Sequence, residues 1–148
     1  MTLSVHNPTV PAPRIKKRRN EQAYVMDAHR RLRCLGIPCK WEAPLLGRSI
    51  DLAFLYEGAV LSVEFKLKDW RRGLQQARDH LLGVDYAYLC LPGKNLSERL
   101  KNEAVAAGIG LLVYRDDAPL PFSIAIEAEQ SNEQWSVARE QLIKMMKV

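Results

Sequence analysis

Apolar residues along the chain recur at two spacings, and each spacing predicts a different secondary structure. Spacings of three and four positions, typical of a helix with one buried face, occur within residues 20–35, 69–82, 97–107 and 131–148. Each segment begins at a helix-capping residue, and these are Asn20, Asp69, Ser97 and Ser131, the last with Gln134 three positions on. The positions expected to be buried are Tyr24, Val25, Ala28, Leu32 and Leu35 in the first helix, Trp70, Leu74, Ala77 and Leu81 in the second, and Trp135, Ala138, Leu142, Met145 and Met146 in the last.

The second spacing is that of strands. Short runs rich in β-branched and aromatic residues occur at 39–43, 50–56, 59–66, 86–91 and 110–114, and residues 122–126 alternate as in an edge strand. The runs at 86–91 and 110–114 are apolar almost throughout, which is typical of strands covered on both faces. The resulting order, α-β-β-β-α-β-α-β with a further edge strand and a C-terminal helix, predicts a single α/β domain with a mixed sheet flanked by helices. Gly73 lies inside the second helix, where glycine costs about 1 kcal/mol relative to alanine.

The hairpin within residues 50–67 has the most informative polar pattern. If Glu57 and Gly58 form a two-residue turn, the strands pair so that Asp51 lies directly opposite Glu64. Directly opposed side chains have Cβ atoms about 5 Å apart. Lys66, two residues beyond Glu64, projects from the same face of the strand. The opposite face holds apolar residues suited to packing against helices, namely Leu52, Phe54, Leu61, Val63 and Phe65.

Two carboxylates held this close repel each other, and a divalent cation between them would turn the repulsion into a binding site. Mg²⁺ takes oxygen ligands and typically uses one or two carboxylates together with substrate phosphate. The pairing alone leaves an alternative open, in which the hairpin is half-exposed and its charges only keep it solvated.

Composition indicates an ordinary globular domain. The chain has 148 residues, of which 47% are hydrophobic and 26% charged. Neither a run of about 20 apolar residues nor a signal-peptide core is present, so no membrane association is expected. Cys34, Cys39 and Cys90 are odd in number and lack metal-ligand spacing, which favours free thiols in a reducing, cytoplasmic environment.

Positive charge is concentrated at the N-terminus. Residues 1–40 hold nine basic and two acidic residues, a net of +7, whereas the remainder holds thirteen against fifteen, a net of −2. Residues 1–19 contain three prolines and are expected to form a flexible basic arm, followed by a core at 20–130 and a docked C-terminal helix at 131–148. Such an arm suits a nucleic-acid backbone, an anionic membrane surface or an acidic protein, and a solubilising tail is the alternative.

Several kinds of catalytic site are excluded by the sequence. Pro92-Gly93-Lys94-Asn95 lacks the remaining residues of a phosphate-binding P-loop. A nucleophile elbow, a CxxC pair and a zincin helix are all absent. His6, His29 and His80 are scattered, and none has a helical partner suited to binding a metal.

Asp51, followed after thirteen residues by Glu64-Phe65-Lys66, resembles the motif of the PD-(D/E)XK nuclease superfamily. The resemblance covers roughly residues 20–114 and implies a restriction-endonuclease-like fold. It implies that Asp51, Glu64 and the Phe65 carbonyl bind Mg²⁺, for which Mn²⁺ can substitute. Lys66 would then orient or activate the attacking water. Ile50 stands where many members have proline, a departure common in the superfamily.

The resemblance also suggests further site residues. Glu21 stands where many relatives have an additional acidic residue, although it also suits the N-terminus of a helix. Gln75 or Gln76 occupies the position of a helix glutamine found in several branches, and Gln76 is the preferred candidate. The basic residues expected to neutralise DNA phosphates are Arg14, Lys16, Lys17, Arg18 and Arg19 in the arm, with Arg71 and Arg72 in the second helix.

The sequence therefore predicts a metal-dependent nuclease acting on DNA, in repair, recombination or phage-related processing. A non-catalytic DNA-binding module that keeps the fold is the alternative. A third interpretation is a basic-armed protein-interaction domain whose acidic residues are structural. The choices between endonuclease and exonuclease, between DNA and RNA, and between a monomer and a homodimer stay open at this stage.

Overall fold

Six strands form one mixed sheet in the computed structural model, which describes residues 19–93 and 95–147. Along the chain the elements are α1 (Glu21–Cys34), β1 (Cys39–Leu45), β2 (Arg48–Tyr56), β3 (Ala59–Phe65), α2 (Trp70–Asp79), the 3₁₀ turn η1 (His80–Leu82), β4 (Tyr86–Cys90), α3 (Glu98–Ala107), β5 (Gly110–Tyr114), β6 (Phe122–Ile126) and α4 (Ser136–Met146). This is the order predicted from the sequence, so the α/β class with a mixed sheet and flanking helices is confirmed.

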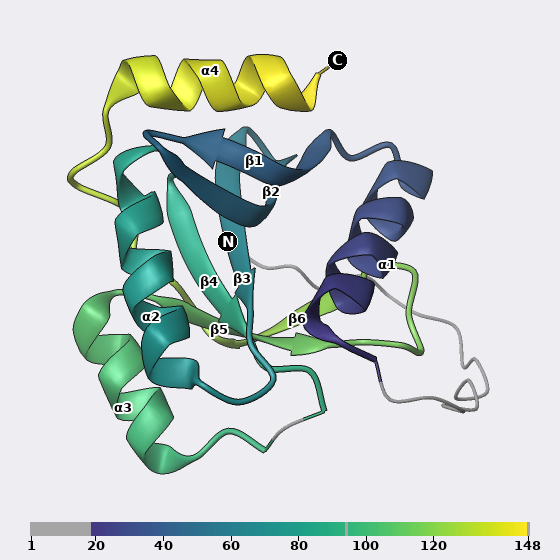
Figure 1. Cartoon of the computed structure of the whole chain (residues 1–148), viewed down its shortest axis with the longest axis vertical. Coiled ribbons are helices and arrows are strands. Elements are labelled where there is room, and N and C mark those ends of the chain that lie inside the picture. The colour runs from purple at the N-terminus through teal and green to yellow at the C-terminus, as the bar shows by residue number, and fades with distance from the viewer. Residues whose placement is uncertain (1–18, 94, 148) are drawn as a thin grey trace.

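The strands lie in the sheet in the order of the chain, from β1 to β6. β1 and β2, β2 and β3, and β5 and β6 pair antiparallel. β4 pairs parallel with both of its neighbours, β3 and β5. α2 connects β3 to β4 and α3 connects β4 to β5, as parallel pairing requires. One face of the sheet packs against α1, the other packs against α2 and α3, and α4 lies across β1 and β2 (Figure 1).

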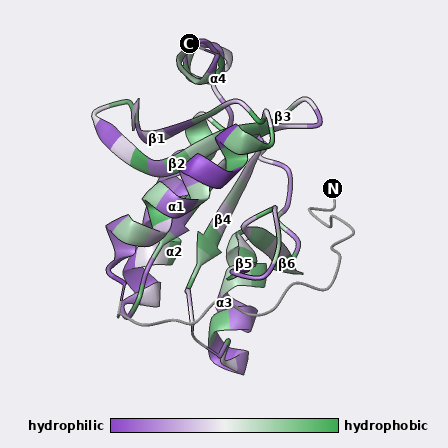
Figure 2. Cartoon of the chain, turned by 90° about the vertical axis from the view of Figure 1, so that its right-hand side faces the viewer, coloured by the Kyte–Doolittle hydropathy of each residue, from purple (hydrophilic) through white to green (hydrophobic). Residues whose placement is uncertain are grey.

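The central strand β4 is apolar and buried. Ala87, Tyr88, Leu89 and Cys90 are inaccessible to solvent, and the arrowhead end of β4 is green in Figure 2. Among the described helices, none combines the length and the apolar character needed to cross a lipid bilayer.

The predicted register of the β2–β3 hairpin is confirmed. Tyr56 pairs with Ala59, and the ladder continues to Leu52 opposite Val63. Glu57 (φ 51°) and Gly58 (φ 78°) both adopt the left-handed conformation, which defines a type I′ turn. The β1–β2 connection repeats this pattern at Leu46 (φ 50°) and Gly47 (φ 79°).

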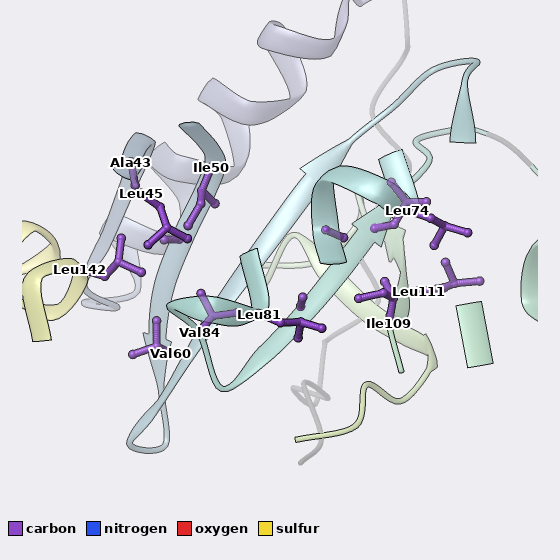
Figure 3. Close-up of a cluster of buried hydrophobic side chains, with 14 of the residues drawn as sticks. Ala43, Leu45, Ile50, Val60, Leu74, Leu81, Val84, Ile109, Leu111 and Leu142 are labelled. Atoms are coloured by element: carbon purple, nitrogen blue, oxygen red, sulfur yellow. The ribbon is translucent and has the colours of Figure 1, made fainter. Parts of the chain in front are cut away.

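The β1–β2 hairpin changes face in the middle. Cys39 belongs to the core beside α1, but Ala43, four residues later on the same strand, belongs to the core beside α2 and α4. Glu42 lies between them with a φ of 48°, and its position in the register is opposite Asp51. β2 changes face at the same level, since Leu52 packs on the α1 side and Ile50 on the other. The outer half of this hairpin therefore turns its apolar side chains toward α4, where Leu45 and Ile50 lie near Leu142 (Figure 3).

Two details predicted from the sequence are wrong. The last helix begins at Ser136 and not at Ser131, so Trp135 precedes it and is 50% exposed. The reason is that residues 131–135 hydrogen-bond to η1: the Ser131 hydroxyl donates to the Leu81 carbonyl (2.7 Å) and the Trp135 N–H donates to the Leu82 carbonyl (2.7 Å). Leu35 is 43% exposed, because α1 ends at Cys34 and Leu35 is only its C-cap.

Candidate metal site

A pocket of about 290 Å³ lies where the β1–β2 hairpin changes face, between β2, β3 and α2. It is lined by Arg48, Ser49, Asp51, Glu64, Gln76, Asp79 and His80. The strands contribute Asp51 and Glu64, which directly follow the last pair of the ladder, Leu52 with Val63, and whose carboxylates interact. α2 contributes Gln76 and Asp79, and His80 is the first residue of the η1 turn that directly follows α2.

The two carboxylates have different environments. Asp51 is partly exposed, and its Oδ2 accepts a hydrogen bond from the Phe65 N–H (2.9 Å). Glu64 is only 3% exposed. Burial, followed by the nearby Asp51 carboxylate and its hydrogen bond, raises the pKa of Glu64 to about 9, while the charge of Lys66 acts in the opposite direction. In the absence of a cation, Glu64 therefore holds a proton at neutral pH, and a cation between the two groups would release it.

Lys66 directly follows the end of β3, is not among the residues that line the pocket, and packs against α2. Its N–H donates to the Cys90 carbonyl (3.0 Å), which fixes the backbone beside β4. A Cβ at Gly73 would lie 2.7 Å from Lys66 Cγ and 2.6 Å from Leu89 Cδ1. Gly73 therefore allows α2 to approach the sheet closely enough to pack against the aliphatic part of Lys66. This contact is the structural reason for a glycine inside the helix.

Glu21 lies at the end of β3 and not among the residues that line the pocket. Its Oε2 accepts a hydrogen bond from the Leu67 N–H (2.8 Å), one residue beyond Lys66. The structure thus brings the first residue of α1 next to the strand end that carries the predicted catalytic lysine. A role in chemistry stays a prediction.

The two candidate glutamines are separated by the structure. Gln76 lines the pocket, and its Oε1 is buried without a hydrogen-bond partner. Gln75 is exposed, and its Nε2 lies 3.4 Å from Asp79 Oδ1. The geometry therefore places the preferred candidate, Gln76, beside Glu64.

The basic residues predicted to contact DNA fall into three groups. Arg14, Lys16, Lys17 and Arg18 lie outside the described residues. Arg19 is engaged within the protein: it forms an ion pair with Asp116 (2.9 Å), and its guanidinium lies 5.0 Å from the centre of the Tyr24 ring. Arg71 and Arg72 are exposed at the start of α2, and the Arg71 guanidinium stacks on Trp70 at 4.5 Å from the ring centre.

His80 is one of four pocket residues that the sequence did not identify, with Arg48, Ser49 and Asp79. It is 2% exposed, and its Nε2 lies 3.9 Å from Glu64 Oε2. Burial lowers the pKa of His80 to about 4, although the Asp79 charge and a backbone hydrogen bond at Ser49 act in the opposite direction, so the imidazole is neutral at pH 7. The signal in the sequence was its position four residues after Gln76, although glutamine is not the usual partner of a metal-binding histidine.

Buried polar atoms without partners are concentrated at this pocket. In the described part of the chain, six buried side-chain nitrogen or oxygen atoms have no hydrogen-bond partner, and three of them line the pocket: Glu64 Oε2, Gln76 Oε1 and His80 Nδ1. Buried polar groups are normally paired, so this concentration fits a site that binds a polar ligand. Within the described ranges, no three His, Cys, Asp or Glu side chains are already grouped around one ion position. The oxygen-rich donor set predicted from the sequence, two carboxylates and a carbonyl, fits Mg²⁺.

Among the solved structures similar to this chain are an XisH family protein and SfsA. No family model and no curated protein matches the sequence. An XisH family protein from Nostoc punctiforme matches with a TM-score of 0.43 and 15% identity, over 70% of this chain and 97% of that chain. SfsA from Pyrococcus furiosus, determined in complex with Ca²⁺, matches with a TM-score of 0.39 and 15% identity, over 73% of this chain and 62% of that chain.

Proposed function

We propose that the protein is a metal-dependent nuclease that hydrolyses phosphodiester bonds in DNA. The observation that supports this most directly is the pocket in which the carboxylates of Asp51 and Glu64 interact beside unpaired buried polar atoms. Asp51, Glu64 and the Phe65 carbonyl would hold Mg²⁺ or Mn²⁺. When bound, the ion supplies positive charge for the phosphate and makes water easier to deprotonate.

The remaining residues would position the substrate and the water. Lys66, supported along its aliphatic part by α2 at Gly73, would place an ammonium beside the attacked phosphate and orient the water. Glu21 would hold the end of β3 through the Leu67 N–H and so restrict the position of Lys66. Gln76 would donate or accept a hydrogen bond inside the pocket.

DNA would be held through its backbone. Arg71 and Arg72 project from the exposed start of α2, and the basic arm at residues 1–18 adds further positive charge. Contacts of this kind are salt-sensitive and independent of sequence. Arg19 is a weaker candidate than the other arginines because Asp116 already neutralises it. Repair, recombination and phage-related processing are the settings in which such an activity is used.

A DNA-binding module that keeps the fold without cleaving is the second candidate. The observation that favours it is the burial of Glu64, which holds the carboxyl group protonated in the absence of a cation. The two functions differ in one measurable respect, because only the nuclease requires Mg²⁺ or Mn²⁺.

Cleavage assays on single-stranded, duplex, flap and junction DNA, with and without Mg²⁺ or Mn²⁺, test the proposal. Lys66→Met is expected to lower the cleavage rate about 10²–10³-fold, the usual cost of one charge-stabilising donor, while metal affinity measured by calorimetry is retained. Lys101→Met, at a lysine of α3 that pairs with Glu98 and is absent from the pocket lining, is the matched control and is expected to cleave like the wild type. A wild-type protein that binds DNA but neither binds a divalent ion nor cleaves any substrate would establish the binding module instead.

A further inference from the structure

We propose that a second pocket, directly beyond Lys66, binds one unpaired nucleobase, so that the substrate is DNA that is single-stranded or frayed where it is cut. This inference rests on the proposed nuclease function and adds to it a class of substrate. The second pocket measures about 270 Å³. Its lining residues come from the ends of β3 and β4 and from the starts of α2 and α3.

The size and lining of the second pocket suit one base and exclude a base pair. Its volume is the share of about nine water molecules at about 30 Å³ each, and a nucleobase has about as many non-hydrogen atoms. An apolar wall with a few polar groups is typical of small-ligand sites. The polar groups here include the Asn95 amide and the Ser97 hydroxyl, which can pair with the edge of a base. The apolar wall is formed by Leu67, Trp70, Leu91 and Leu100.

The backbone places the second pocket one residue beyond the predicted catalytic lysine. The Lys66 N–H donates to the Cys90 carbonyl (3.0 Å). The residues that directly follow these two, Leu67 and Leu91, both line the second pocket. The Leu67 N–H is held in turn by Glu21 Oε2 (2.8 Å). A phosphate held by Lys66 would therefore bring a neighbouring base to this pocket.

α2 sets the spacing between Lys66 and the second pocket. Gly73 packs against the aliphatic part of Lys66, and Trp70, three residues earlier, lies on the same side of the helix. At about 1.5 Å of rise per residue, Trp70 and Gly73 are about 4.5 Å apart along the helix axis. Neighbouring nucleotides of one DNA strand are about 3.4 Å apart along the duplex axis. The second pocket is thus about one nucleotide from the attacked phosphate.

Trp70 and its neighbours are suited to hold a base together with its phosphate. Trp70 is half-buried, and the Arg71 guanidinium stacks on its ring at 4.5 Å from the centre. This contact steadies the indole and places a positive charge beside the second pocket, where Lys68 adds another. Contact between a base and an aromatic side chain strengthens the binding of single strands and tolerates every base. The second pocket would therefore select an unpaired base without reading its identity.

Binding measured without divalent ions tests the second pocket independently of cleavage. The probes are a labelled single-stranded oligonucleotide and an abasic oligonucleotide of the same length, which keeps every phosphate but has no base. Fluorescence anisotropy should show that the wild type binds the first about 5–150-fold more tightly, the contribution of one stacked base. Trp70→Ala should remove this preference, whereas Trp135→Ala, at an exposed tryptophan absent from the lining, should keep it. Absence of binding, equal affinity for the two strands, or a preference that survives Trp70→Ala would overturn the inference.

A second measurement needs no variant and decides the matter if Trp70→Ala fails to fold. The chain has three tryptophans, and the indole N–H signals of ¹⁵N-labelled wild type are observed by NMR with each oligonucleotide in turn. The Trp70 signal is expected to shift with the base-bearing strand and to stay in place with the abasic strand, while the Trp135 signal stays in place with both. Equal shifts of Trp70 with the two strands would show a phosphate contact only and overturn the base pocket. Absence of cleavage with Mg²⁺ or Mn²⁺, together with a Trp70-dependent preference for bases, would overturn the nuclease and leave the base pocket standing.

Discussion

In the metal-free protein, the burial of Glu64 makes the folded state less stable as the pH rises. The pKa of Glu64 is raised from 4.5 to about 9, chiefly by burial and secondly by Asp51. Between those two values, the folded protein binds one proton more than the unfolded chain at this residue. Raising the pH therefore favours unfolding, by up to about 1.4 kcal/mol per pH unit.

The window from pH 6.5 to pH 8 isolates this effect from that of His80. The pKa of His80 is lowered from 6.5 to about 4 by burial, so its contribution to stability is complete above pH 6.5 and is lost only as the pH falls below that value. In a protein of this size, 1 kcal/mol corresponds to about 2–4 °C in Tm. A decline of a few degrees across the window is thus expected from Glu64 alone.

The decline in stability with pH is measured by urea and thermal unfolding of the metal-free wild type and of Glu64→Gln at several pH values. The variant cannot ionise, so the decline with pH is expected to disappear. Glu103→Gln, which replaces an exposed glutamate paired with Arg99, is the matched control and should retain the wild-type decline. Identical pH dependence in wild type and Glu64→Gln would refute the conclusion that Glu64 is protonated in the folded state. Saturating Mg²⁺ should weaken the decline in the wild type, because metal binding displaces the proton.

Three further predictions concern the helix contact, a turn and the arm. Gly73→Ala should destabilise the fold by about 1–3 kcal/mol, because its Cβ would meet Lys66 and Leu89 at under 3 Å. The variant should also cleave more slowly, and unaltered unfolding by urea would contradict this packing. Leu46→Asn should stabilise the protein by up to about 1–2 kcal/mol, because Leu46 has a φ of 50°, which asparagine adopts more readily, and its side chain is 54% exposed. A lower Tm would show that the leucine side chain packs favourably against the fold. Deletion of residues 1–18, which keeps Arg19, should weaken the salt dependence of DNA binding. The slope of the logarithm of the binding constant against the logarithm of salt concentration should fall by about 0.9 for each phosphate that the arm neutralises. An unchanged slope in a filter-binding series would show that the arm contacts no phosphate.

The sequence predicted those parts of the site that depend on local rules. Glu57 and Gly58 determine the turn, the turn determines the register as far as Leu52 and Val63, and Asp51 and Glu64 directly follow these two residues. Helix caps predicted the starts of α1, α2 and α3 for the same reason, since the capping residue is next to the segment it caps. Each of these predictions needed only residues close together in the chain.

Features that depend on tertiary contacts were not predicted. Gly73 counts as a weakness of α2 until the positions of Lys66 and Leu89 are known. The start of α4 was misplaced because Ser131 donates to the Leu81 carbonyl and does not cap a helix. His80 was dismissed because its neighbour in the pocket, Glu64, is distant in sequence and belongs to a strand.

The change of face at Glu42 and Asp51 has a mechanical consequence for the pocket. The outer half of the β1–β2 hairpin is supported by α4, yet it supplies Arg48 and Ser49 to the pocket wall, while α2 supplies the opposite wall. An ion bound between Asp51 and Glu64 would join these parts, so the amide hydrogens of the hairpin tip and of α4 should exchange more slowly with solvent once the ion is present. The last helix, α4, is far from Asp51 and Glu64 in sequence, yet its packing on the hairpin would then influence how tightly the pocket holds the ion.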